Sequence, residues 1–408
     1  MQVLDRFLRY VVVDTQSDPA STTQPSTKKQ FDLARLLVDE LQELGVSDVE
    51  LDEHGYVYAT LPATPGHETA PVICFCSHMD TSPDASGTDV KPIVHRDYDG
   101  GDLTLPLGNK VVIRASEFAG LSDNIGQTIV TSSGDTLLGA DNKSGIAAIM
   151  AAVEHLLQNP HIPHGRLRLL FTPDEEIGRG VDAVDMEKLA ADFGYTIDGE
   201  ARGSLEDETF SADAATITIE GVSAHPGFGK DKLENAVKIA ADIIAALPRK
   251  GLSPETTADR DGFIHPVSMT AKAEGARIDF ILRDFTTDQL SDYAAVLQSI
   301  IEEIGPNYPN SQVTLEVKEQ YRNMKEVISE HPRVVRLAEE AIRSVGLPVR
   351  RAAIRGGTDG ARLSFMGLPC PNIFAGEHAF HSPYEWASVY EMQKAAEVIV
   401  AISQKNVA

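Results

Sequence analysis

The sequence predicts an α/β protein in which a parallel sheet is covered by helices and interrupted by an inserted α+β domain. In the first half of the chain, short apolar runs alternate with segments of helical periodicity, as in sheets with helices on both faces. In the second half, the order changes to strand, helix, two strands, helix and strand, which is the split βαβ arrangement. The length of 408 residues is sufficient for two or three domains.

The elements of the first half follow from apolar spacing. The N-terminal segment MQVLDRFLRY carries acidic and basic residues within its apolar stretch, so we expect a first helix and not a signal peptide. The run Pro71–Cys76 is unbroken and apolar, as expected of a buried parallel strand. The Gly- and Asp-rich segment 84–134 predicts only loops and short strands. Further helices are expected at 28–44 and 140–157, and further strands at 57–61, 167–171 and 195–197.

A change of pattern marks the inserted domain. Its βαββαβ order is that of ferredoxin-like domains, and we place it at 211–319. The flanking parts, 1–210 and 320–408, are then expected to form one domain. The insertion is expected to hold strands at 215–220, 267–273, 277–283 and 312–317 with helices at 233–247 and 287–304, and the returning chain helices at 332–344 and 391–402.

Composition excludes several classes of function. The 36 basic and 61 acidic residues give a net charge of −25, which repels phosphate backbones and anionic membranes. We therefore expect neither a nucleic-acid nor a membrane partner, and no apolar run approaches the roughly 18–20 residues that cross a bilayer. The cysteines Cys74, Cys76 and Cys370 form no CxxC motif, which argues against a disulfide framework and a thiolate metal site. A cytoplasmic location is expected.

Histidine and acidic side chains follow the predicted strands. His78 and Asp80 come directly after PVICFC, so both point to one side at the carboxyl edge of the sheet. Such a pair suits metal ligation, because a carboxylate fixes the tautomer of its histidine, but an ordinary surface loop is an alternative. Asp141 opens the long predicted helix, where capping is the simpler explanation.

Three more motifs complete this pattern. In TPDEEIG, one of Glu175 and Glu176 could bind a cation while the other acts on water, although a solvated acidic turn would look the same. Asp198 ends another predicted strand, and His378 and His381 lie three residues apart in GEHAFHSP. Two histidines and three carboxylates without cysteine suit a dinuclear zinc-type site, in which two metal ions activate water.

Longer motifs resemble a known family. SHMDTSPD, TLLGADNKSGIAAI, TPDEEIGRG, TIDGE, HPG, ILRDF and IRGGTDGARLSFMGLPCPN are similar to those of the peptidase T family, the tripeptide aminopeptidases among the aminoacylase/glutamate-carboxypeptidase-like dizinc hydrolases. The resemblance runs from the first helix to the last. It implies a dizinc exopeptidase-like catalytic domain with an inserted lid, and a zinc metallopeptidase of peptide catabolism that releases the N-terminal residue of short peptides, chiefly tripeptides.

The resemblance also implies a ligand set for two Zn²⁺ ions per subunit, other divalent metals being alternatives. His78 and Asp198 correspond to ligands of one ion. Glu176 and His381 correspond to ligands of the other, and Asp141 to the bridging carboxylate.

Catalytic and substrate-binding roles are implied in the same way. Asp80 corresponds to the residue that orients His78, and Glu175 to the general base. His225, in the GVSAHPG motif of the lid, corresponds to the histidine that stabilises the oxyanion. Arg283 and Arg355 are candidate clamps for a substrate carboxylate, although an ordinary salt bridge would also explain Arg283.

The sequence departs from the family pattern at three places. Asn142 stands where a second acid is typical, and Glu200 where a second glycine is common. The stretch GEHAFHSPYEW differs from the usual Gly/Tyr/Asn-rich segment, so His378 is a rival of His381 for the metal, and the serine and glutamate that follow favour His381.

Two other functions stay open at this point. A hydrolase of N-acyl amino acids or dipeptides would carry the same metal centre. A metal-binding protein without catalysis would have no need of Asp80, Glu175 and His225, which speak against it. Lid-mediated dimers occur among relatives, so a homodimer is a further expectation.

Overall fold

The computed structural model describes residues 3–108 and 110–408, which divide into two compact units. The first unit takes in the chain up to Asp207 with Met324–Ala352 and Thr358–Ala408, and the second takes in Glu208–Asn323 with Ala353–Gly357. The second unit is thus an insertion, for which the sequence predicts 211–319. Ala353–Gly357, which the sequence assigns to the returning chain, lies in the second unit, where the Phe210 N–H donates to the Ile354 carbonyl at 3.1 Å.

An eight-stranded sheet with strand order β1-β2-β8-β3-β9-β16-β10-β15 belongs to the first unit, apart from the last two residues of β10 and of β15. The neighbours β8, β3, β9 and β16 run parallel, so their carboxyl ends meet at one edge. This confirms the predicted parallel sheet. The strands are β1 (Asp48–Leu51), β2 (Val57–Leu61), β3 (Ile73–His78), β8 (Leu167–Thr172), β9 (Phe193–Gly199), β10 (Ser204–Thr209), β15 (Arg350–Ile354) and β16 (Asn372–Phe374).

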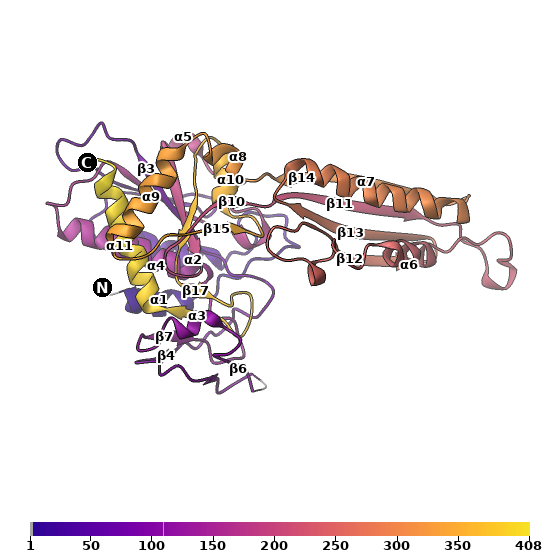
Figure 1. The fold of residues 1–408 in the computed structure, drawn as a ribbon, viewed down its shortest axis with the longest axis horizontal. Helices are drawn as coiled ribbons and strands as arrows, with labels where there is room; N and C mark the ends of the chain where they lie inside the picture. The colour runs from indigo at the N-terminus through magenta and orange to yellow at the C-terminus, as the bar shows by residue number, and fades with distance from the viewer. Residues whose placement is uncertain (1–2, 109) are drawn as a thin grey trace. The chain divides into compact units, whose positions relative to one another are not determined.

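Helices pack on this sheet and on one another. Helix α4 packs on β3 and β9 and against α1 and α11, and α11 also contacts α9 (Figure 1). On β3, Cys74 and Cys76 are fully buried in a cluster with Leu363 of α10, and burial raises the pKa of Cys74 to about 12. The helices are α1 (Val3–Val11), α2 (Gln30–Glu43), α4 (Ala140–Gln158), α5 (Met186–Leu189), α8 (Lys325–Ile328), α9 (Pro332–Ser344), α10 (Asp359–Phe365) and α11 (Val389–Lys405).

Within its described residues, the segment 84–134, for which the sequence predicts only loops and short strands, holds α3 (Ala119–Ser122) and four short strands. Two of these strands join β17 and β18 of the C-terminal region in a sheet of order β17-β18-β7-β4. This sheet carries the ends of the GEHAFHSPYEW stretch. The strands are β4 (Ile93–His95), β5 (Leu103–Thr104), β6 (Val112–Ile113), β7 (Ile129–Thr131), β17 (Glu377–His378) and β18 (Trp386–Ser388).

The second unit is a four-stranded antiparallel sheet of order β12-β13-β11-β14, packed against α6 and α7. Alternate strand residues such as Ile217, Ile278 and Phe280 form its core with the helices. The chain order β11-α6-β12-β13-α7-β14 confirms the predicted βαββαβ arrangement. The elements are β11 (Ser211–Glu220), α6 (Ala236–Ala246), β12 (Phe263–Lys272), β13 (Gly275–Asp284), α7 (Thr287–Ile304) and β14 (Gln312–Tyr321). Within the described ranges, every helix is too short or too polar to cross a membrane.

Candidate metal centre

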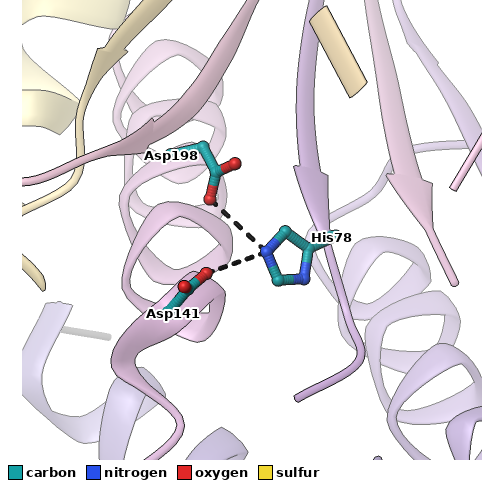
Figure 2. A group of neighbouring side chains, drawn as sticks. All are labelled: His78, Asp141 and Asp198. Carbon is teal, nitrogen blue, oxygen red and sulfur yellow. Dashed lines mark hydrogen bonds and ion pairs between the residues drawn. The ribbon is translucent and has the colours of Figure 1, made fainter. Parts of the chain in front are cut away.

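Three of the predicted site residues lie at the carboxyl edge of the parallel sheet. His78 is the last residue of β3, Asp198 lies near the end of the neighbouring β9, and Asp141 lies in the first turn of α4 (Figure 2). Gly139 has a φ of +80°, which lets the chain turn into α4. At Gly145, a Cβ atom would lie 1.9 Å from the Ile197 carbonyl oxygen, so only glycine allows α4 to approach β9 this closely.

His78, Asp141 and Asp198 form the first group that could hold a cation. The His78 Nε2 atom is 2.9 Å from Asp141 Oδ1 and 3.4 Å from Asp198 Oδ1 (Figure 2). One ligand atom from each of the three residues lies within 4.8 Å of the others. The histidine is 2 % exposed, so these charged groups meet away from bulk water.

Asp141, Glu176 and His381 form the second group, again with ligand atoms within 4.8 Å of one another. The His381 Nε2 atom is 2.7 Å from Glu176 Oε2 and 3.4 Å from Asp141 Oδ2. Asp141 thus belongs to both groups, with Oδ1 facing one histidine and Oδ2 facing the other. This is the arrangement that a bridging carboxylate requires.

Asp80 contacts residues of both groups. It is fully buried, and its Oδ1 atom lies 3.3 Å from His78 Nδ1. Its two carboxylate oxygens also accept the backbone N–H groups of Glu175, at 3.0 Å, and Glu176, at 3.2 Å. The Glu175 side chain approaches His78 Nε2 to 3.9 Å but is in neither group. Asp80 therefore contacts both a histidine of the first group and the turn that carries a carboxylate of the second.

Burial and charge shift the pKa values of these side chains. Burial and the charge of Asp141 raise the pKa of Glu176 to about 8, and burial raises the pKa of Asp198 to about 6. Burial also holds the pKa of Glu175 well above its usual range. Although burial opposes it, the carboxylates of Asp141 and Glu176 raise the pKa of His381 to about 11. The carboxyl groups outnumber the histidines that could offset their charges, and bound cations would favour their ionised forms.

The donor atoms fit divalent cations. Glu176 Oε1 is buried and has no hydrogen-bond donor among the residues that the structure describes, and the buried Asp198 Oδ1 has only the 3.4 Å contact with His78 Nε2 among them. A buried carboxylate oxygen without a close donor is costly, and a cation would satisfy it. Two histidines with three carboxylates are a donor set that Zn²⁺ accepts.

His378, the rival of His381, lies apart from both groups. Its ring stacks on Trp386 with centroids 3.9 Å apart and an interplanar angle of 12°. Its Nε2 atom is 2.7 Å from Glu391 Oε2, and the side chain is buried. The His378 side chain, on β17, is therefore packed against Trp386 of β18 and Glu391 of α11.

The remaining predicted residues, His225, Arg283 and Arg355, lie in the second unit and make their hydrogen bonds within it. The exposed His225 accepts the Gly227 N–H at Nδ1, at 3.2 Å. The Arg283 guanidinium donates to backbone carbonyls of β11 and β13. The Arg355 guanidinium donates to the carbonyls of Asp259, at 2.8 Å, and Asp261, at 2.9 Å.

Sequence reasoning missed Asp84, whose Oδ2 atom lies 3.2 Å from His381 Nδ1. Asp84 stands in the same SHMDTSPD motif as His78 and Asp80, and that proximity was the only signal available. Each candidate histidine ligand thus has one ring nitrogen toward its group and the other toward an aspartate. Such contacts fix the tautomer of a metal-binding histidine.

Comparisons with known proteins identify the family and the fold. Residues 137–405 match the family described as peptidase family M20/M25/M40. Over 401 residues the chain is 47% identical to peptidase T of Halothermothrix orenii, covering 98% of each chain. The crystal structure of aminopeptidase PepT from Bacillus cereus superposes with a TM-score of 0.75 at 24% identity, covering 100% of this chain and 98% of that chain. A Bacillus subtilis protein described as a dinuclear metal-binding peptidase of family M20 superposes with a TM-score of 0.67 at 14% identity, covering 99% and 97%. The two superpositions show the fold and confirm the predicted fold class.

Proposed function

Because the chain belongs to peptidase family M20/M25/M40, we propose that this hydrolase is a zinc-dependent aminopeptidase that releases the N-terminal residue of short peptides, chiefly tripeptides. The full-length relatives named peptidase T support this substrate class. The observation that carries the chemistry is the pair of ligand groups that share Asp141.

We assign His78 and Asp198 to one zinc ion, Glu176 and His381 to the other, and Asp141 to both. The buried Glu176 Oε1, which has no donor among the described residues, supports this assignment. When bound, two such ions lower the pKa of water and polarise the scissile carbonyl.

Glu175 is the proposed general base. Its carboxylate lies beside the first group without belonging to it, and its backbone N–H is held by Asp80 at 3.0 Å. In this role Glu175 takes a proton from the attacking water and returns it to the amine that leaves. Asp80 fixes the position of Glu175 relative to His78, because it contacts both residues.

The proposed roles of the second unit rest on the family resemblance. His225 would donate a hydrogen bond to the oxyanion, and its imidazole is exposed. Arg283 and Arg355 would bind the substrate carboxylate in a two-pronged fashion. To do so, Arg355 has to exchange its contacts with two backbone carbonyls for the substrate.

The first experiment is turnover of a small substrate panel, with metal content measured in the same sample. The panel holds a dipeptide, a tripeptide, an N-blocked tripeptide, a tetrapeptide and an N-acetyl amino acid. Hydrolysis of the free-amine tripeptide that a chelator abolishes and zinc restores is the expected result. Cleavage of the N-acetyl amino acid alone would contradict the proposed substrate class and indicate a hydrolase of N-acyl amino acids. Absence of turnover from a metal-loaded protein would contradict the catalytic proposal.

A second experiment separates the two arginines. Arg355→Ala and Arg283→Ala are each measured with a tripeptide and with the same tripeptide carrying a C-terminal amide. A clamp for the substrate carboxylate raises KM for the free acid and leaves the amide unchanged. Equal effects on both substrates would show that the residue serves structure.

We also propose a homodimer through the second unit and a cytoplasmic location. The edge strand β12 carries Val267 and Met269, which are 51% and 52% exposed, and these support a contact surface. The free cysteines Cys74, Cys76 and Cys370 suit a reducing compartment. Light scattering of the full chain and cell fractionation test the two proposals, and a monomer at micromolar concentration would contradict the first.

A further inference from the structure

Glu385 is a buried carboxylate that binds the backbone beside the metal centre. It lies between β17 and β18, four residues after His381, and is 1 % exposed. Its Oε2 atom accepts the N–H groups of Leu138, at 2.6 Å, and Gly139, at 2.8 Å. Its Oε1 atom accepts the N–H group of Asp141 at 3.0 Å. A single side chain therefore binds three donors of the turn that leads into α4.

Two of these donors, the N–H groups of Gly139 and Asp141, are ones that a helix leaves without partners, and Leu138 precedes the capping residue. The first N–H groups of any helix lack an acceptor within the helix, and a nearby Asp side chain commonly caps them. In α4 the capping position is Gly139, which has no side chain to offer. Asp141 and Asn142 have non-helical backbone angles, so the turn is not held by regular helical hydrogen bonds. Glu385 supplies the acceptors that this turn requires.

The contact has a consequence for Asp141. An aspartate at a helix start ordinarily uses its carboxylate on the backbone, and the sequence alone favours that explanation. Here both carboxylate oxygens of Asp141 face histidines, at 2.9 Å from His78 and 3.4 Å from His381. Because Glu385 binds the backbone donors, the Asp141 oxygens stay available to a metal.

We propose that Glu385 is a positioning residue of the metal centre, which caps the turn into α4 and so keeps both oxygens of Asp141 free to bridge two metal ions. This inference rests on the proposed function. Glu385 also follows His381 on the same short segment, so it ties the loop of one candidate ligand to the backbone of another. A displacement of this segment would then move His381 and Asp141 together.

The test is zinc binding by Glu385→Gln. A glutamine has one acceptor oxygen, so its NH₂ group must face a backbone N–H, either that of Asp141 or those of Leu138 and Gly139. We expect zinc affinity about 10–100-fold below that of the parent protein, the usual loss when a residue that orients a ligand is changed. The turnover number should fall with the loss of metal, while KM for the tripeptide stays unchanged.

Glu391→Gln is the matched control. Glu391 is also 1 % exposed and accepts hydrogen bonds from side chains, but its partners are His378 and Asn124. Both variants are stripped of metal with a chelator, checked for thermal unfolding, and titrated with zinc against a competing indicator. The inference expects weak binding only in Glu385→Gln. Equal affinity in Glu385→Gln and the parent protein, or an equal loss in Glu391→Gln, would overturn it.

A shorter acidic side chain at position 385 separates hydrogen bonding from packing. Glu385→Asp retains two acceptor oxygens on a shorter side chain, so it should bind zinc more tightly than Glu385→Gln. An equal loss in both variants would indicate packing alone and overturn the inference. A parent protein that binds no divalent metal would overturn the proposed function as well, whereas tight binding by both parent and Glu385→Gln would overturn only the role of Glu385.

Discussion

Replacement of Gly145 by alanine should disrupt the metal centre, although Gly145 is no candidate ligand. It lies in α4, one turn after Asp141, where the helix meets β9. A Cβ atom at this position would lie 1.9 Å from the Ile197 carbonyl oxygen and 2.6 Å from Ser77 Oγ. The first of these atoms belongs to the backbone next to Asp198, so a change of side-chain rotamer cannot relieve the clash.

The size of the effect follows from these distances. Cβ atoms essentially never lie closer than 3.0 Å to such a neighbour, so α4 and β9 must separate by about 1.1 Å. Metal–ligand distances tolerate only about 0.2 Å, so Asp141 and Asp198 could not both keep their places. Overpacking of this kind costs about 1–3 kcal/mol of stability, and a misplacement of about 1 Å can lower a rate by about 10²-fold.

The assay compares Gly145→Ala with Gly275→Ala. Gly275 is the first residue of β13, and a Cβ atom at this position would lie 3.5 Å from the Ile219 carbonyl oxygen, which is ordinary van der Waals contact, so alanine should fit there. Metal content after dialysis, kcat/KM and thermal unfolding are measured for both variants. We expect loss of metal and turnover in Gly145→Ala only. A Gly145→Ala protein with the metal content and turnover of the parent would refute the argument that this close approach sets the distance between Asp141 and Asp198.

Three more predictions concern other residues. Glu175→Gln should keep its metal and lower kcat by about 10²–10⁴-fold, and near-parental turnover would show that Glu175 is not the base. His381→Ala should lower metal affinity while His378→Ala leaves it unchanged, because His378 binds Glu391 at 2.7 Å; the reverse result would exchange their roles. Burial lowers the pKa of His164, despite the hydrogen bond that its Nδ1–H donates to the Gly165 carbonyl at 2.8 Å. The unfolded chain therefore takes up this proton first, and folding stability should fall as the pH drops below about 6.5, by at most ~1.4 kcal/mol per pH unit. Denaturant titrations from pH 5 to 8 should show this contribution disappearing in His164→Gln but not in the exposed His161→Gln, and equal slopes in all three proteins would contradict it.

Much of the catalytic fold could be predicted because local patterns coincide with burial. The apolar run Pro71–Cys76 predicts a buried parallel strand, and β3 lies between β8 and β9 with every residue buried. The prediction ended the strand too early, since β3 continues through Ser77 to His78. These polar residues remain in the sheet because they pair with Phe171 and Thr172 of β8. Polar residues therefore do not reliably mark the end of a strand whose last residues belong to a functional site.

Contacts between distant segments could not be predicted in this way. The sequence favours Asp141 as a helix cap, but the acceptor for that turn is Glu385, whose partners lie more than 240 positions away in the chain. Asp84 and His381 are likewise separated by 297 positions. Asp84 shares a motif with His78, and the glutamate after His381 favours that histidine, but neither local pattern indicates which atoms Asp84 or Glu385 contacts. Strand order could indicate that the ligands gather at one edge, but it could not indicate which side chains hold them there.

The three adjacent acids of TPDEE show how the structure separates similar residues. Asp174 is fully buried and accepts hydrogen bonds from the backbone N–H of Ser26 and the side chain of Gln30, each at 2.7 Å. Glu176 pairs with His381 at 2.7 Å. Among the ion pairs and hydrogen bonds of the described residues, the Glu175 carboxylate has only its 3.9 Å approach to His78. A general base must take up and release a proton without first breaking a strong hydrogen bond or ion pair of its carboxylate. Of the three, only Glu175 meets that condition while its backbone is held in place by Asp80.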